Sequence, residues 1–123
     1  MIEFKFRVVR GERIVGYEAL IDGYWCRSDN GKDWQFGTLN SSGHKRYQYT
    51  GLKDKNGVEI YEGDIAKGTA CNGQVLWDVD QWIIDPIPSD KFPARLGSEN
   101  YQVEVIGNIY QNKDLLNIEA NVL

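Results

Sequence analysis

The sequence is poor in the residue types that build metal and redox sites. Its 123 residues include one histidine, His44, and two cysteines, Cys26 and Cys71. The cysteines are far apart and show no CxxC spacing, so we expect free thiols and no disulfide. A zinc site would have to recruit carboxylates to complete its ligand set. We therefore expect no cofactor.

Long apolar runs are also missing. No run approaches the length that spans a bilayer, and the amino-terminal MIEFKFRVVR alternates charged and apolar groups where a signal peptide would have an apolar core. We expect a soluble, cytoplasmic protein with no membrane partner. The three prolines, Pro86, Pro88 and Pro93, lie close together and predict a connecting loop or a sheet edge.

The chain has no excess of basic residues. Its net charge is −4; residues 1–67 contain 11 basic and 10 acidic groups, and residues 68–123 contain 3 and 8. Non-specific binding to nucleic acid needs a basic face that displaces counterions, which the chain as a whole does not offer. A local basic patch remains an alternative if folding brings together the side chains of Lys5, Arg7, Lys45 and Arg46.

The sequence consists mainly of short stretches in which apolar and polar residues alternate as they do in a strand. Ile2 to Val8 is apolar at every second position, which places the apolar set on one face of a strand. Asp22-Gly23 and Asn56-Gly57 are favoured hairpin dipeptides, and Asn72-Gly73 predicts a further turn.

The strand after Asn72-Gly73 continues the same alternation through an acidic stretch. We expect Val79 to point inward, with Asp78 and Asp80 on the solvated side. This stretch lacks the spacing of a calcium loop.

In total, these patterns predict seven to nine short strands. Residues 28–45 read as a long loop in which Trp34 and Phe36 could form a brief strand, and Asn112 is a plausible N-cap for a short helix. The expected fold is a single domain over residues 1–123. It is mainly β, a small antiparallel barrel with extra strands and a short C-terminal helix.

Three stretches carry a family resemblance: YTGLKDKNGVEIYEGDIA, VEVIGNIYQNKDLL and the opening EFKFRVV. They resemble the YopX family, small proteins of bacteriophages and prophages, although VRGERIVGYEAL departs from that family's pattern. The resemblance implies a phage or prophage origin and a mainly β domain with an SH3-like barrel. It implies no catalytic residues.

The glycines and carboxylates of these stretches are interpreted as scaffold. Glu62 and Asp64, with Glu59, could form a divalent-metal site of a hydrolase. We favour the alternative, in which Gly63 supplies an unusual backbone angle and Asp64 caps the amides of the bend. The predicted structural turn residues are Gly51, Asp54, Asn56, Gly57, Gly63, Asp64, Gly107 and Asn108.

Other catalytic patterns are absent or incomplete. TGLKDKNG lacks the spacing of a phosphate-binding loop and lies between strands, so it predicts a hairpin. Cys71 could be a nucleophile if His44 lay beside it, but no orienting group is identifiable and a small core residue is the commoner role.

Aromatic residues beside lysines are the best candidates for a binding surface. The candidates are Tyr47, Tyr49, Lys53, Tyr61, Lys67, Trp77 and Trp82. The leading hypothesis is a non-catalytic accessory protein that binds an unidentified host or phage protein, or its own copies as a homo-oligomer. The alternatives are a nucleic-acid-binding SH3-like or OB-like module, and a metal-dependent hydrolase.

Overall fold

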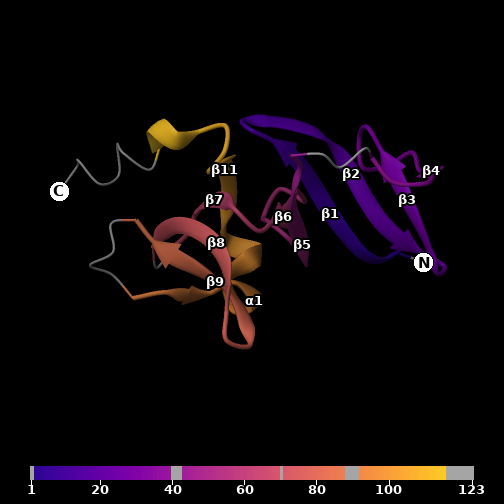
Figure 1. The fold of residues 1–123 in the computed structure, drawn as a ribbon. Coiled ribbons are helices and arrows are strands. Elements are labelled where there is room, and N and C mark those ends of the chain that lie inside the picture. The colour runs from indigo at the N-terminus through magenta and orange to yellow at the C-terminus, as the bar shows by residue number, and fades with distance from the viewer. Residues whose placement is uncertain (1, 40–42, 70, 88–91, 116–123) are drawn as a thin grey trace. The chain divides into compact units, whose positions relative to one another are not determined.

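The computed structural model describes residues 2–39, 43–69, 71–87 and 92–115, although not the side chains of residues 2, 3 and 99. The chain divides into two compact units, residues 1–49 and 50–123 (Figure 1). The described strands form two sheets in which neighbouring strands run antiparallel, so the predicted mainly β class is confirmed. No helix in the described part of the chain is long and apolar enough to cross a membrane.

The first unit is built from one sheet with the strand order β4-β3-β2-β1-β5. Its strands are β1 (Ile2–Arg10), β2 (Arg13–Ile21), β3 (Tyr24–Ser28), β4 (Gln35–Phe36) and the beginning of β5 (Lys45–Lys53). Asp22 and Gly23 join β2 to β3 with φ angles of 50° and 84°, as expected for the predicted hairpin turn. The remainder of β5 belongs to the second unit, together with its neighbour in the sheet, β6 (Glu59–Tyr61).

The second unit contains a sheet with the strand order β10-β9-β8-β7-β11. Its elements are β7 (Asp64–Lys67), β8 (Asn72–Asp78), β9 (Gln81–Pro86), β10 (Ala94–Arg95), α1 (Leu96–Glu99), the 3₁₀ helix η1 (Asn100–Gln102) and β11 (Glu104–Asn108). Residues 113–115 begin a helical turn where the C-terminal helix was expected, and residues 116–123 lie outside the described part.

The hydrophobic core cluster lies in the second unit. Its buried members are Ile60, Ala66, Cys71, Val75, Ile84, Ala94, Leu96 and Val103. Among the described residues of the first unit, the buried hydrophobic side chains are those of Val8, Val9 and Ala19, and the buried polar ones are those of Lys5, Glu18 and Ser28. The two units therefore differ in the number of apolar side chains that they bury.

Two fold predictions are corrected. The described strands form open sheets and do not close into a barrel. Asn72 and Gly73 lie inside β8 and form no turn; the reversal precedes them, where the Gly68 amide donates to the Cys71 carbonyl. Gly73 is required because a Cβ there would collide with the Asp85 carbonyl on β9.

Candidate functional site

Asp54 is a buried carboxylate that joins a hairpin turn to β11. Its Oδ1 accepts hydrogen bonds from the amides of Asn56 (2.8 Å) and Val58 (2.9 Å), and its Oδ2 accepts one from the Val105 amide (2.9 Å). Gly57, with φ 80°, closes the turn by donating its amide to the Asp54 carbonyl. The carboxylate is occupied by backbone amides and serves as scaffold.

Gly63 and Asp64 form a second junction of the same kind. Asp64 is 1% exposed, and its Oδ2 accepts the Tyr61 amide at 2.8 Å. Gly63 has φ 86°; its amide donates to the Val75 carbonyl and its carbonyl accepts the Ile109 amide. This is the arrangement that the scaffold interpretation describes.

The two main signature stretches meet in the pairing of β7 with β11. Asn108 lies opposite Asp64, and Gly107 lies opposite Ile65. The Asn108 side chain accepts the Gln111 amide at 2.8 Å and so fixes the turn that leaves β11. The two signature stretches are therefore neighbours in space, and both contribute to the β7–β11 pairing of the second unit.

The remaining predicted turn residue, Gly51, lies exposed within β5 and has φ 84°. Among the described residues, no group of three or more His, Cys, Asp or Glu side chains could hold a metal ion. Cys71 is a buried free thiol of the second unit and lies 3.8 Å from the Ile84 carbonyl. His44, which a nucleophilic Cys71 would need beside it, belongs to the first unit and is half-buried.

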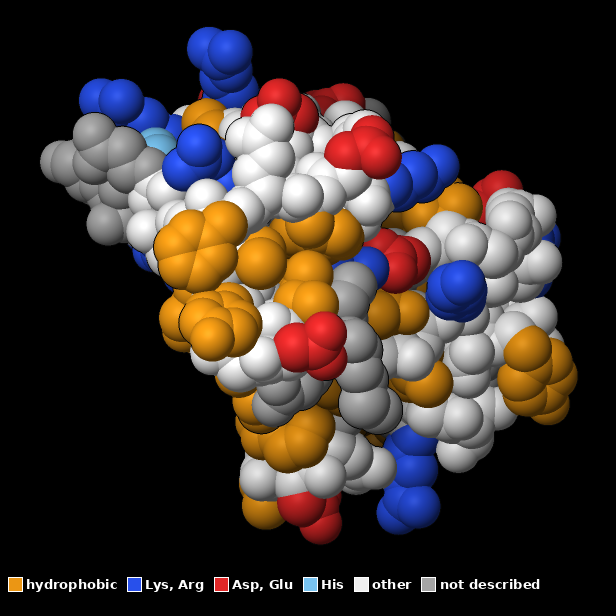
Figure 2. Space-filling model, turned by 90° about the vertical axis from the view of Figure 1, so that its right-hand side faces the viewer, with side chains coloured by type: hydrophobic (Ala, Val, Ile, Leu, Met, Phe, Trp, Pro, Cys, Tyr) orange, Lys and Arg blue, Asp and Glu red, His pale blue; other side chains and the backbone are white. Residues whose placement is uncertain are grey.

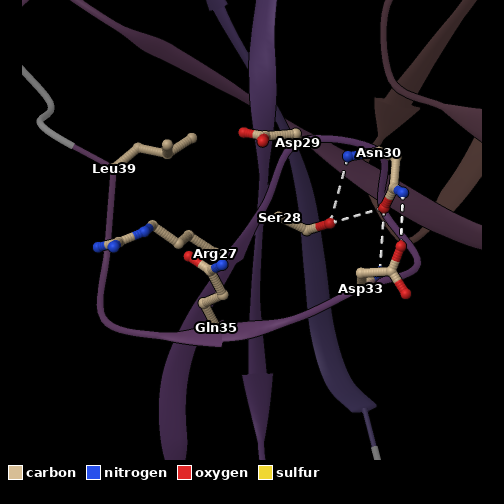
Figure 3. Close-up of a pocket in the computed structure, with 7 residues that line it drawn as sticks. All are labelled: Arg27, Ser28, Asp29, Asn30, Asp33, Gln35 and Leu39. Carbon is tan, nitrogen blue, oxygen red and sulfur yellow. Dashed lines mark hydrogen bonds between the residues drawn. The ribbon is translucent and has the colours of Figure 1, made fainter.

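A small polar pocket lies in the first unit (Figure 3). Its volume is about 180 Å³, and it is lined by Arg27, Ser28, Asp29, Asn30, Asp33, Gln35 and Leu39. Ser28, Asn30 and Asp33 bond one another and their own backbone, as the dashed lines in Figure 3 show in part. Because these polar groups already hold the turn, and the volume is below that of ordinary ligand sites, we assign the pocket a structural role.

One face of the first sheet is aromatic and basic. Residues opposite one another in antiparallel strands share a face. One row across the sheet is Tyr47, Arg7, Tyr17 and Ser28; the next is Lys5, Ala19, Cys26 and Phe36; further rows pair Ile21 with Tyr24 and Val9 with Lys45. None of these residues is acidic. We call this surface the aromatic face.

The outer rings of the aromatic face are open to solvent. Tyr24 is 62% exposed and Phe36 is 75% exposed, and their ring centroids lie 5.8 Å apart. Lys45 is also exposed. Lys5 is 7% exposed, and its ammonium group lies 4.6 Å from the centroid of the Tyr49 ring, which places a cation–π contact at the inner part of the face.

The opposite face also carries exposed rings, Phe4 (51% exposed) and Trp25 (43% exposed), and in addition it holds a buried carboxylate. Glu18 is 2% exposed; its carboxylate accepts the Arg46 guanidinium at 2.6 Å and the Leu39 amide at 2.7 Å. Arg46 is therefore paired there, so the basic patch that the sequence left as an alternative is divided. Lys5, Arg7 and Lys45 lie on the aromatic face, and Arg46 lies on the opposite face. Figure 2 shows how hydrophobic and basic side chains lie exposed next to one another on the molecular surface.

The predicted binding residues are scattered. Tyr47 and Tyr49 lie in the first unit, whereas the five others belong to the second: Lys53, Tyr61, Lys67, Trp77 and Trp82. Tyr61 is 2% exposed, and Trp82 packs against the core cluster. Trp77 is exposed at the end of β8, and Lys67 and Lys53 are exposed at strand ends.

Sequence reasoning missed Tyr24 and Phe36, the two most exposed rings of the aromatic face. Both belong to strands that the sequence indicated, but strand alternation does not say which face meets solvent. Their proximity follows only from the pairing of Cys26 with Phe36.

Comparisons with known proteins bear on the family and the fold. A family model described as YopX protein matches residues 20–117. Among solved structures, the crystal structure of protein EF1440 from Enterococcus faecalis is similar, with 22% sequence identity, a TM-score of 0.50, and coverage of 94% of this chain and 98% of that one. At this identity the likeness concerns the fold alone. A search of curated proteins gave no match.

Proposed function

The chain belongs to the YopX family, and we propose that it acts by binding a protein segment through the aromatic face, without catalysing a reaction. The carboxylates of the family signatures support the second half of this proposal. Asp54 and Asp64 are buried and bonded to backbone amides, so their oxygens are engaged in the fold.

The exposed pair of Tyr24 and Phe36 carries the proposal. Large rings at the surface are typical of protein-binding surfaces, because rings bury much apolar area with little loss of conformational entropy. The basic residues Lys5, Arg7 and Lys45 lie on the same face of the sheet, so we expect the bound segment to carry acidic as well as apolar side chains. The partner would be a host or phage protein, as the family resemblance implies.

A random-peptide display library tests this function. We expect wild-type protein to enrich sequences that combine acidic and apolar residues, and the double variant Tyr24→Ala/Phe36→Ala to lose them. The matched control is Tyr101→Ala/Phe92→Ala, which removes an exposed tyrosine and an exposed phenylalanine from the second unit. Enrichment that survives in the Tyr24/Phe36 variant, or no enrichment by wild type, overturns the proposal.

Single-stranded nucleic acid is the second candidate for the same face. Rings that stack bases beside cations that meet phosphates are the usual means of such binding, and the rows provide both. Anisotropy of a labelled oligothymidine tests it. If Arg7 and Lys45 each meet one phosphate, the logarithm of the binding constant should fall with the logarithm of salt with a slope of about −1.4. Binding of this kind that the selected peptides do not displace would favour nucleic acid over protein.

A further inference from the structure

The outer side of β4 is an edge of the first sheet. β4 ends the strand order, and its two residues pair with β3. The Gly37 amide donates to the Trp25 carbonyl at 3.0 Å, so these two residues occupy a hydrogen-bonded position of the ladder. Because bonded and non-bonded positions alternate in an antiparallel ladder, the amide and the carbonyl of Phe36 point away from β3. We call this outward side of residues 35–37 the β4 edge.

The strand that ends the other sheet, β11, has its main chain capped. The Asp54 carboxylate accepts the Val105 amide, and the Val103 carbonyl accepts the Lys55 amide. Groups that are bonded in this way cannot pair with a foreign strand. In the described part of the chain, no cap of this kind is bonded to Phe36. The β4 edge is therefore able to accept a further strand.

The β4 edge also has an exposed ring on each face of the sheet. Phe36 lies on the aromatic face, where its ring meets that of Tyr24. On the opposite face lies the exposed ring of Trp25, and its neighbour across the ladder is Gly37, which has no side chain. A segment that lies flat on the sheet reaches the rings of one face. A strand added at the edge reaches both faces, because its side chains point to the two faces alternately.

A cation lies at the same edge on the opposite face. Arg27 is two residues from Trp25 on β3, and it pairs with Gln35 in the register of β3 and β4. A Cβ added to Gly37 would lie 3.2 Å from Arg27 Nη1, which places the guanidinium group at the edge. Figure 3 shows this group directed away from Asp33. A carboxylate on an added strand, at the position opposite Gly37, would lie beside it.

We propose that the partner segment binds as an additional β-strand at the β4 edge. This inference rests on the proposed function and specifies the conformation and the sequence pattern of the segment. The residue opposite Phe36 exchanges main-chain hydrogen bonds with it and places an apolar side chain against the rings of Phe36 and Tyr24. The next residue points to the other face, where an acidic side chain pairs with Arg27. The segment is thus extended, with apolar and acidic residues in alternation.

Titration of the full chain with two synthetic peptides, followed by heteronuclear NMR, tests this pattern. In one peptide valine and aspartate alternate. The other has the same composition, but its valines are contiguous. We expect the alternating peptide to bind at least about tenfold more tightly, because alternation places every valine on the face of Phe36. The amide signals of residues 35–37 should shift most.

Removal of the Phe36 amide tests the main-chain contact. Phenyllactic acid in place of Phe36 keeps the ring and replaces the N–H group with an ester oxygen. Since this amide points away from β3, the pairing of β3 with β4 keeps its donors. The affinity for the alternating peptide should fall about threefold to tenfold. The same replacement at Phe92, an exposed phenylalanine of the second unit, is the matched control and should leave the affinity unchanged.

The variant Arg27→Gln tests the charge. It should weaken binding of the alternating valine–aspartate peptide about twofold to fivefold. It should not change the affinity for a peptide in which serine replaces each aspartate. An equal effect on both peptides would overturn the position assigned to the acidic side chain.

Equal binding of the two valine–aspartate peptides, or full affinity of the ester variant at Phe36, would overturn strand addition. The proposed function fails separately, when wild-type protein selects no peptide from the display library. Selected peptides that depend on Tyr24 and Phe36 but bind the ester variant normally would leave the aromatic face as a binding surface and exclude the β4 edge. Wild-type dimers that the ester at Phe36 abolishes would make a second copy the occupant and overturn the assignment to a partner segment.

Discussion

At the scale of single residues, the Asp54 carboxylate joins two segments that are far apart in the sequence. It accepts amides from Asn56, Val58 and Val105, which belong to a turn and to a strand about fifty residues further along the chain. Hydrogen bonds to a charged acceptor contribute on the order of 1.5–3 kcal/mol each, and amides left without a partner add a desolvation cost. Asp54→Ala should therefore lower the free energy of unfolding by about 3–5 kcal/mol.

Urea unfolding followed by tryptophan fluorescence measures this loss. Asp85→Ala is the control, since Asp85 is an exposed aspartate of the same unit and its loss should change stability by less than about 0.5 kcal/mol. Asp54→Asn should lie between the two, because the amide group keeps one acceptor oxygen and loses the charge. Equal losses for Asp54→Ala and Asp85→Ala would contradict the scaffold role.

Residue types predicted some of the backbone turns correctly and others wrongly. Asp22-Gly23 and Gly57 adopt the positive φ angles that their turn dipeptides indicate. Asn72-Gly73 has the same turn dipeptide in sequence, but Gly73 allows two strands to approach closely and forms no turn. Glycine is required both where φ is positive and where there is no space for a Cβ, and the sequence does not distinguish the two cases. The inward position predicted for Val79 is wrong, because Val79 is 88% exposed and its φ of 59° opposes the propensity of a β-branched residue.

At the scale of elements, the pairing of β8 with β9 depends on Gly73. It lies opposite Pro86, and a Cβ at this position would meet the Asp85 backbone, which cannot move without breaking the ladder. Gly73→Ala should therefore cost about 3 kcal/mol or more. Gly97 in α1 has open space around it, so Gly97→Ala should be neutral or stabilise by up to about 1 kcal/mol.

Thermal unfolding of these two alanine variants compares identical chemical changes in two environments. A Gly73→Ala variant as stable as Gly97→Ala would mean that the two strands are not in this register. The positions of the strands followed largely from alternation and turn dipeptides. The register did not, because it depends on partners distant in the sequence, and the aromatic face emerges only from the register. Helix α1 was missed since its four residues are too few to show a helical period.

At the scale of the whole molecule, the two units differ in what stabilises them. The second unit has the hydrophobic core cluster, whereas the buried set of the first unit includes Lys5, Glu18 and Ser28 beside three apolar residues. A 49-residue segment based on one sheet has little apolar area to remove from water. The first unit should therefore open at a lower free energy than the second.

Hydrogen exchange on the intact chain tests this difference with matched strands. In its sheet, β2 lies between β1 and β3, and β8 lies between β7 and β9, so the amides of both strands are bonded on two sides. Packing is then the main difference, and the slowest amides of β2 should exchange at least about tenfold faster than those of β8. Equal protection would instead mean that both units unfold in one cooperative step.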